Sequence, residues 1–168
     1  MTETGSARDL TDPRVNEAVW RAQDLLRAYA TRDRAAIGGH LAHLEDDQLE
    51  WAGDVLTEFW NDVVDMFTGF QDSESLLLGV DAVAHSAPPE YEFAVTTAVR
   101  RLARGEATLE ELVCGDEQQT RAGLHTLAAY TVAFLLLSLS PQRIEELLDR
   151  AAEVIGVLGG LPRPYSVT

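Results

Sequence analysis

The feature that most restricts the fold is a run of twenty-one residues without a formal charge, at positions 122–142. A helix that crosses a membrane needs about 20 mostly apolar residues, so the run approaches that length. Polar side chains such as His125 and Tyr130 interrupt it, and its apolar part is confined to 124–139. We therefore interpret 116–138 as the buried central helix of a bundle, because a helix that is apolar on every face is usually such a core helix.

Apolar residues elsewhere in the chain recur at spacings of three and four, which is the period of an amphipathic helix. Asp12-Pro13 is typical of a helix start, and Pro88-Pro89 separates two helical segments. Strand-like alternation is absent, although 76–83 is also compatible with a buried strand. The expected helices are 12–30, 33–44, 46–67, 73–85, 89–104, 116–138 and 141–158, with a short helical turn after the capping box Thr108–Glu111.

These segments predict an all-α, single-domain bundle of six or seven helices around the helix 116–138. A chain of 168 residues is long enough to bury a core in one domain. We expect a disordered tail at 1–11, the domain at 12–160 and a non-helical C-terminal tail at 161–168. Gly38-Gly39 weakens the helix 33–44, and close helix packing is the usual reason to tolerate such a pair.

The negative charge of the protein is concentrated in its middle third. The formal net charge is −15, and residues 35–99 hold thirteen carboxylates without one Lys or Arg. The segments on either side are nearly balanced, since all thirteen basic residues of the protein lie there and all are arginine. A strong field of one sign bears on the choice of partners and not on the fold.

Much of this charge forms one row along the helix 46–67. Six carboxylates share one face of that helix, opposite its Trp, Phe, Val and Leu side chains. The row extends for about 27 Å at 1.5 Å per residue. We call this row the acidic ridge, and it consists of Asp47, Glu50, Asp54, Glu58, Asp62 and Asp65.

Four interpretations of the acidic ridge are open. It is a solvated outer face, a face covered by arginines, a surface that recognises a basic partner, or a site for a divalent cation such as Mg²⁺ or Ca²⁺. Recognition of a partner requires an exposed ridge, which Asp72, Glu74 or Asp81 would extend. The arginines that would cover the ridge are Arg14, Arg21 and Arg32, or Arg100, Arg101 and Arg104.

The absence of several residues and motifs excludes many kinds of catalysis. Without lysine there is no P-loop lysine and no Schiff base. The chain also lacks Gly-x-Ser-x-Gly, Gly-x-Gly-x-x-Gly, Cys-x-x-Cys, His-Glu-x-x-His and Glu-x-x-His. We therefore expect no cofactor, and binding rather than catalysis. Direct binding of nucleic acid is also disfavoured, because a net charge of −15 opposes the phosphate backbone.

Three histidines are candidates for a specific role. His40 and His43 have a spacing at which two side chains on one helix can share a metal ion, although no third ligand completes the pattern. His125 lies within the apolar central helix. A hydrogen bond with Thr126 or Tyr130 would satisfy it there, and the alternative is a polar ligand pocket near His125 and Tyr130.

We therefore expect a soluble, cytoplasmic protein that acts through protein–protein contact, as an adaptor, regulator or oligomeric module in a homodimer or small complex. The first alternative is an acidic mimic or inhibitor of a nucleic-acid-binding protein, which would use the acidic ridge. The second is a small-ligand-binding or enzymatic bundle with a pocket near His125 and Tyr130. The N-terminal residues lack the apolar segment of a secretory signal, and the single Cys114 suits a reducing compartment.

Overall fold

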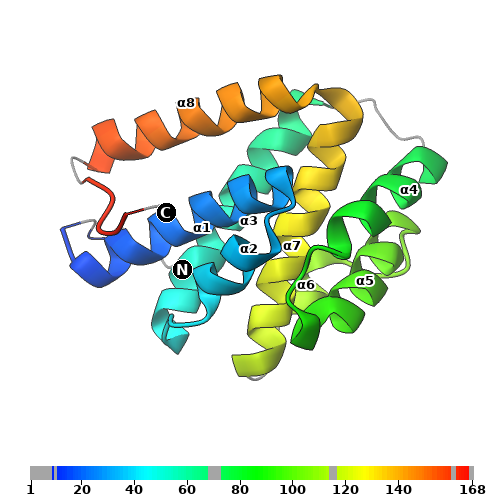
Figure 1. Cartoon of the computed structure of the whole chain (residues 1–168), viewed down its shortest axis with the longest axis horizontal. Coiled ribbons are helices and arrows are strands. Elements are labelled where there is room, and N and C mark those ends of the chain that lie inside the picture. Colours follow the sequence, from blue (N-terminus) through cyan, green and yellow to red (C-terminus); the bar gives the residue numbers. More distant parts are fainter. Residues whose placement is uncertain (1–8, 10, 68–72, 114–116, 160–161, 167–168) are drawn as a thin grey trace, which may run out of the picture.

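The chain folds into a bundle of helices in a computed structural model that describes residues 9, 11–67, 73–113, 117–159 and 162–166 (Figure 1). These residues contain eight helices and no strand, so the prediction of an all-α bundle is confirmed and the strand alternative at 76–83 is wrong. The count exceeds the expected six or seven because the turn after Thr108 forms a short helix of its own. The helices are α1 (Pro13–Thr31), α2 (Arg34–Leu41), α3 (Asp46–Met66), α4 (Ser73–Ala84), α5 (Pro89–Ala103), α6 (Leu109–Val113), α7 (Glu117–Ser138) and α8 (Pro141–Gly159).

Helix α7 runs through the middle of the molecule, with α4 and α5 on one side and α1, α2 and α3 on the other (Figure 1). Its buried side chains include Leu124, Leu127, Val132 and Leu135. Among the described residues, the segment Thr120–Ser138 is the one long and apolar enough to cross a membrane by length and composition, with a mean hydropathy of 1.2. Of the apolar window in this segment, 61% is buried inside the protein, as expected for the central helix of a bundle.

Residues at the helix ends explain where several helices begin. The Asp12 carboxylate accepts a hydrogen bond from the Arg14 backbone N–H at 2.8 Å, and Pro13 occupies the first position of α1. Asp33 caps α2 in the same way through the N–H of Ala36. Helix α2 ends at Leu41, three residues before the expected end.

Close packing between helices requires glycine at Gly53 but not at Gly38 or Gly39. A Cβ atom added at Gly53 would lie 3.1 Å from Leu124 Cδ2, so this residue lets α3 approach α7 closely. A Cβ added at Gly38 or Gly39 would meet no atom within 4 Å. The interpretation of Gly38-Gly39 as a site of close helix packing is therefore wrong, and the close approach is at Gly53.

The segment 162–166 is non-helical and packs against α1. The Asp24 carboxylate, only 3% exposed, accepts hydrogen bonds from Arg163 Nη2 and from the Tyr165 hydroxyl, both at 2.7 Å. Asn16 Nδ2 donates to the Pro162 carbonyl at 3.2 Å. Two positive charges face aromatic rings at this contact, since the Arg21 guanidinium lies 3.8 Å from the centre of the Tyr165 ring and Arg163 lies over Trp20. These contacts connect the end of the chain to its first helix.

Candidate functional site

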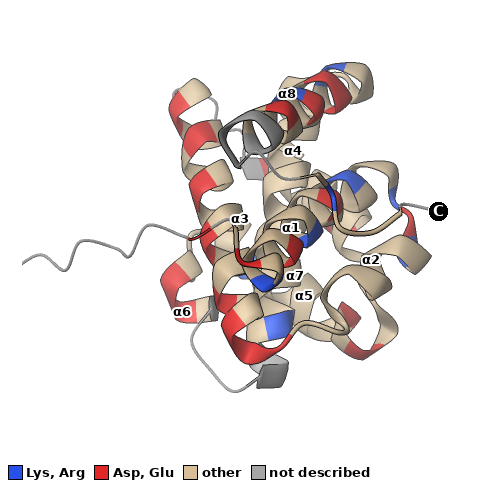
Figure 2. Ribbon diagram, turned by 90° about the vertical axis from the view of Figure 1, so that its left-hand side faces the viewer, with Lys and Arg blue, Asp and Glu red and all other residues tan. Residues whose placement is uncertain are grey.

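The acidic ridge lies on the outer face of α3. Glu50, Asp54, Glu58, Asp62 and Asp65 are exposed, whereas Asp47 is half-buried. The opposite face of the helix is buried against the core and fixes the direction in which the ridge points. Figure 2 shows the acidic positions following one another along α3, with further acidic residues on α6 and α8. The buried residues of α3 are Gln48, Leu49, Ala52, Gly53, Val55, Leu56, Phe59 and Val63.

Arg14 neutralises one end of the ridge. Its Nη2 atom lies 2.7 Å from Asp47 Oδ1 and 2.5 Å from Glu45 Oε2. Arg21 instead pairs with Glu17 on its own helix. In the part of the chain that the structure describes, no basic side chain pairs with the other end of the ridge, at Asp62 and Asp65, or with Glu50.

The residues expected to extend the ridge differ from one another. Asp72 lies outside the described residues, and Glu74 is exposed on α4. Asp81 is engaged, because Arg100 donates from Nε to Oδ1 at 2.7 Å and from Nη2 to Oδ2 at 3.0 Å. These hydrogen bonds are the main reason that the pKa of Asp81 lies below its usual value. Asp81 is therefore a member of a bidentate ion pair.

The two candidate metal ligands differ in their surroundings. His40 is 8% exposed, its Nδ1 atom is buried without a hydrogen-bond partner, and burial lowers the pKa of its imidazole. His43, three residues later, is exposed. Within the described ranges, no group of three or more His, Cys, Asp or Glu side chains could hold a metal ion. Metal binding at His40 and His43 stays a prediction.

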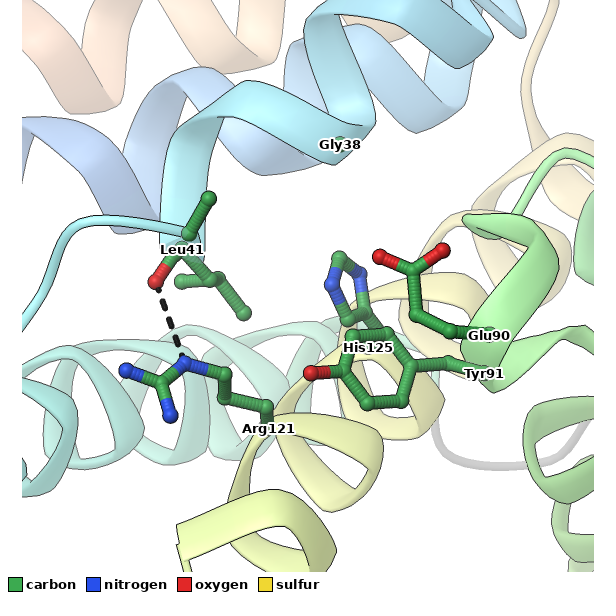
Figure 3. A pocket seen from close by; sticks show the side chains of 7 residues that line it. Gly38, Leu41, Glu90, Tyr91, Arg121 and His125 are labelled. Carbon is green, nitrogen blue, oxygen red and sulfur yellow. Dashed lines mark hydrogen bonds between the residues drawn. The ribbon is translucent and has the colours of Figure 1, made fainter.

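A cavity of about 290 Å³ lies where α2, α5 and α7 meet. Figure 3 shows His125 and Tyr91 at its centre, with Arg121 on one side and Glu90 on the other. Tyr130 is not part of the cavity wall, because its ring packs against Trp60 with a centroid distance of 5.1 Å. The cavity is lined by Gly38, Leu41, Ala42, Glu90, Tyr91, Arg121 and His125.

Two tyrosines hold the His125 ring in place. The Tyr29 hydroxyl and His125 Nδ1 are 3.0 Å apart, and the Tyr91 ring stacks on His125 at a centroid distance of 5.4 Å. Burial, with a smaller contribution from the charge of His40, lowers the pKa of His125 to about 3. Burial also raises the pKa of Tyr29, so its hydroxyl keeps its proton. At neutral pH His125 is therefore an uncharged hydrogen-bonding group and not a carrier of protons.

The hydrogen-bond network assigns the tautomer of His125. The Tyr29 hydroxyl has no other partner among the described residues, so its proton is satisfied only if it donates to His125 Nδ1. The ring proton of His125 is then on Nε2. That nitrogen has no partner in the described part of the chain and is not among the fully enclosed unpaired atoms. It therefore presents an N–H donor to the cavity.

Arg121 forms one wall of the cavity and ties α7 to the end of α2. Its Nη2 atom donates to the Leu44 carbonyl at 2.6 Å and its Nε to the Leu41 carbonyl at 3.4 Å (Figure 3). Sequence reasoning found His125 but missed Tyr91, Arg121 and Glu90. No local pattern marks them, because the cavity exists only after three helices that are separate in the sequence come together.

No protein-family model, curated protein or solved structure matches the chain.

Proposed function

We propose that this protein binds a partner protein and that the acidic ridge recognises a basic surface of that partner. The observation that supports the proposal is the exposure of the ridge without compensation at Glu50, Asp62 and Asp65 within the described residues. A basic partner would provide positive charge opposite Glu50, Asp62 and Asp65.

Repulsion between the carboxylates of the acidic ridge destabilises α3, and this supports the proposal. Like charges four residues apart on a helix destabilise it by roughly 0.2–0.5 kcal/mol per pair. Residues three or four apart on a helix have Cβ atoms about 5–6 Å apart, which is within the ~8 Å screening length at physiological salt. Arginine on the same face of α3 would remove this repulsion, but α3 contains none. A partner that binds the ridge would relieve the repulsion and add attraction.

The rigidity of the ridge favours recognition over unspecific attraction. Helix α3 is anchored by buried side chains such as Leu56, Phe59 and Val63, so its carboxylates keep a fixed spacing. A preorganised surface loses less conformational entropy on binding than a flexible acidic segment does. The partner is therefore expected to carry a row or groove of Arg and Lys with a matching repeat.

Affinity capture from the native host with the wild type, a ridge variant and a control variant tests the proposal. The ridge variant carries Glu50→Arg and Asp62→Arg. The matched control carries Glu145→Arg and Glu153→Arg, which change the net charge equally on the exposed face of α8. We expect the same basic protein to be retained by the wild type and the control and to be lost with the ridge variant.

The captured partner is then purified and titrated against each protein at rising salt. Binding to the ridge should weaken steeply as salt increases, because exposed charges are screened. Equal binding by the ridge variant and the wild type would contradict the proposal. So would a partner that the α8 control loses to the same extent.

A more specific form of the proposal is that the ridge mimics nucleic acid and inhibits a nucleic-acid-binding protein. The exposed, regularly spaced carboxylates favour it, although Asp81 is held by Arg100 and does not extend the ridge freely. If this form is correct, a short DNA duplex competes with the wild-type protein for the purified partner. If DNA and the protein bind the partner together, the partner uses a different basic surface.

We also propose that the protein is cytoplasmic and that it forms a homodimer or a small complex. The support is the mixed polar surface around a buried apolar core, together with large apolar side chains left on the surface, such as Leu78 at 79% and Phe93 at 86% exposed. Sedimentation of the purified protein at several concentrations tests the oligomer, and a monomer throughout would contradict it.

A further inference from the structure

We propose that the face of α1 that holds the C-terminal segment 162–166 is a recognition site for a partner protein whose chain presents an arginine and a tyrosine two residues apart. The segment 162–166 occupies this site until the partner displaces it (Figure 1). The site lies on α1 and the acidic ridge lies on α3, so the two surfaces are independent. Three features support the site: a buried carboxylate, the pattern of exposure along the segment, and two buried donors that the segment leaves unpaired.

Asp24 selects the arginine and the tyrosine. Its side chain is 3% exposed, and its Oδ1 and Oδ2 atoms accept hydrogen bonds from Arg163 Nη2 and from the Tyr165 hydroxyl, both at 2.7 Å. Burial, together with the hydrogen bond to Asp24, raises the pKa of Tyr165, so its hydroxyl keeps its proton and donates. A buried carboxylate requires a cation and hydrogen-bond donors. One arginine and one tyrosine at this spacing supply both.

The surface of α1 adds a second contact to each of these two side chains. The Arg21 guanidinium lies 3.8 Å from the centre of the Tyr165 ring, and the Arg163 guanidinium lies 4.8 Å from the centre of the Trp20 ring. Such cation–π contacts favour the planar guanidinium over an ammonium group. The site therefore distinguishes arginine from lysine by stacking, and tyrosine from phenylalanine by the hydroxyl that Asp24 accepts.

The segment contacts α1 through alternate side chains, as a bound peptide does. Arg163 and Tyr165 are half-buried, whereas Pro162, Pro164 and Ser166 are exposed. This alternation is typical of a peptide that lies on a surface and directs every second side chain into it. The two prolines restrict the free segment, which lowers the entropy lost when it docks. The contact thus has the character of a ligand on a surface and adds no apolar side chain to the core.

The fit between the segment and the site is incomplete. Trp20 Nε1 and Arg163 Nε are buried and have no hydrogen-bond partner in the part of the chain that the structure describes. The two donors belong to neighbouring groups, since Arg163 lies over the Trp20 ring. A buried donor without an acceptor is unfavourable. A partner that adds an acceptor beside its arginine would satisfy the Trp20 donor and would displace the segment for that reason.

A peptide with the sequence of residues 161–168 tests the site in the full-length chain. It is titrated by calorimetry into the wild type and into an open-site variant that carries Arg163→Ala and Tyr165→Ala. In the wild type the attached segment competes at an effective concentration on the order of millimolar. We therefore expect the open-site variant to bind the peptide at least about tenfold more tightly than the wild type does. A peptide with alanine at both positions should bind neither protein.

A substitution at Asp24 shows whether the peptide binds at the proposed site. Asp24→Asn is added to the open-site variant, where it also removes a buried charge that has lost its cation. We expect this protein to bind the peptide at least about tenfold more weakly than the open-site variant does, because the charge-assisted hydrogen bonds are lost. The matched control is Glu145→Gln at an exposed position on α8, which should leave binding by the open-site variant unchanged.

Displacement of the attached segment is measured in the wild type itself. The unlabelled peptide is added to ¹⁵N-labelled protein up to about 10 mM, which is comparable with the effective concentration of an attached segment. We expect the amide signals of residues 163, 165 and 166 to move toward the positions of a free chain. The signals of residues 54–62 on α3 should not move.

Several results would overturn the inference. They are equal binding of the peptide by the wild type and the open-site variant, full binding after Asp24→Asn, and signals of the attached segment that stay in place. A wild-type dimer that the added peptide dissociates would also overturn it, because a second copy of the chain would then be the occupant. Far-UV circular dichroism establishes that the open-site variant is folded. If it is not, the displacement measured in the wild type decides the question alone.

Discussion

His125 is the residue whose burial has the clearest consequence for stability. Its pKa is about 3 in the folded protein and the ordinary value is 6.5, because burial disfavours the charged ring. Below pH 6.5 the unfolded chain binds a proton on this ring that the folded chain does not bind. The stabilisation is therefore fully present above pH 6.5 and is lost progressively as the pH falls toward 3.

We expect the free energy of unfolding to fall by about 2 kcal/mol from this residue alone between pH 7 and pH 5. Burial lowers the pKa of His40 as well, which adds a change of the same sign. Urea unfolding at constant ionic strength measures the total. His125→Gln keeps an acceptor for the Tyr29 hydroxyl and does not titrate, so its stability should vary less over this range. An unchanged pH dependence in this variant would contradict the assignment.

The helices show how local sequence determines an element. The predicted ends of most helices lie within one or two residues of the observed ends, because Asp12-Pro13, Pro88-Pro89 and Pro141 act on the backbone directly. Helix α2 is the exception, since it ends at Leu41 and the Leu41 and Leu44 carbonyls bind Arg121, which is distant in sequence. Its end therefore coincides with a tertiary contact that periodicity does not reveal.

Gly39 in α2 and Gly53 in α3 lead to opposite predictions for the effect of alanine on stability. Gly39→Ala should stabilise the protein by about 0.5–1 kcal/mol, because alanine favours the helix and a Cβ atom there meets no atom within 4 Å. Gly53→Ala should destabilise it by about 1 kcal/mol, because the new Cβ would lie 3.1 Å from Leu124 Cδ2, and Leu124 is fully buried.

Urea unfolding of the two variants beside the wild type measures both changes. The contrast between them matters more than either value, since both substitutions add the same methyl group and gain similar helix propensity. Stabilisation by Gly53→Ala as large as that by Gly39→Ala would mean that Leu124 moves aside freely, and would contradict a tightly packed contact between α3 and α7.

At the scale of the whole molecule, the sequence predicted the class of fold and the direction of the acidic ridge but not the sites that depend on distant residues. The ridge follows from one helix and its period, so its exposed face could be deduced from 46–67 alone. The partners Tyr29 and His125 are 96 positions apart, and Asp24 and Arg163 are 139 positions apart. Periodicity carries no information on such pairs. The predicted pocket near His125 and Tyr130 therefore included only one of the residues that line the cavity, and the contact of 162–166 with α1 was not predicted.

The contact between the C-terminal segment and α1 leads to a prediction about the integrity of the whole fold. Asp24 is 3% exposed, and Arg163 is the cation that compensates its charge. Arg163→Ala would leave this carboxylate buried with the Tyr165 hydroxyl as its remaining partner from the segment. We expect a loss of about 2–3 kcal/mol, because an uncompensated buried charge is costly and Tyr165 offsets only part of that cost.

Urea unfolding compares Arg163→Ala with Arg150→Ala, which removes the same charge from an exposed position on α8 and should change stability by less than about 0.5 kcal/mol.

Adding Asp24→Asn to Arg163→Ala should recover part of the loss, since the neutral amide no longer needs a cation. A double variant no more stable than Arg163→Ala would show that the arginine acts through its packing over Trp20. Equal stability of the two arginine variants would instead mean that the segment 162–166 does not hold α1 in solution, and that water compensates the charge of Asp24.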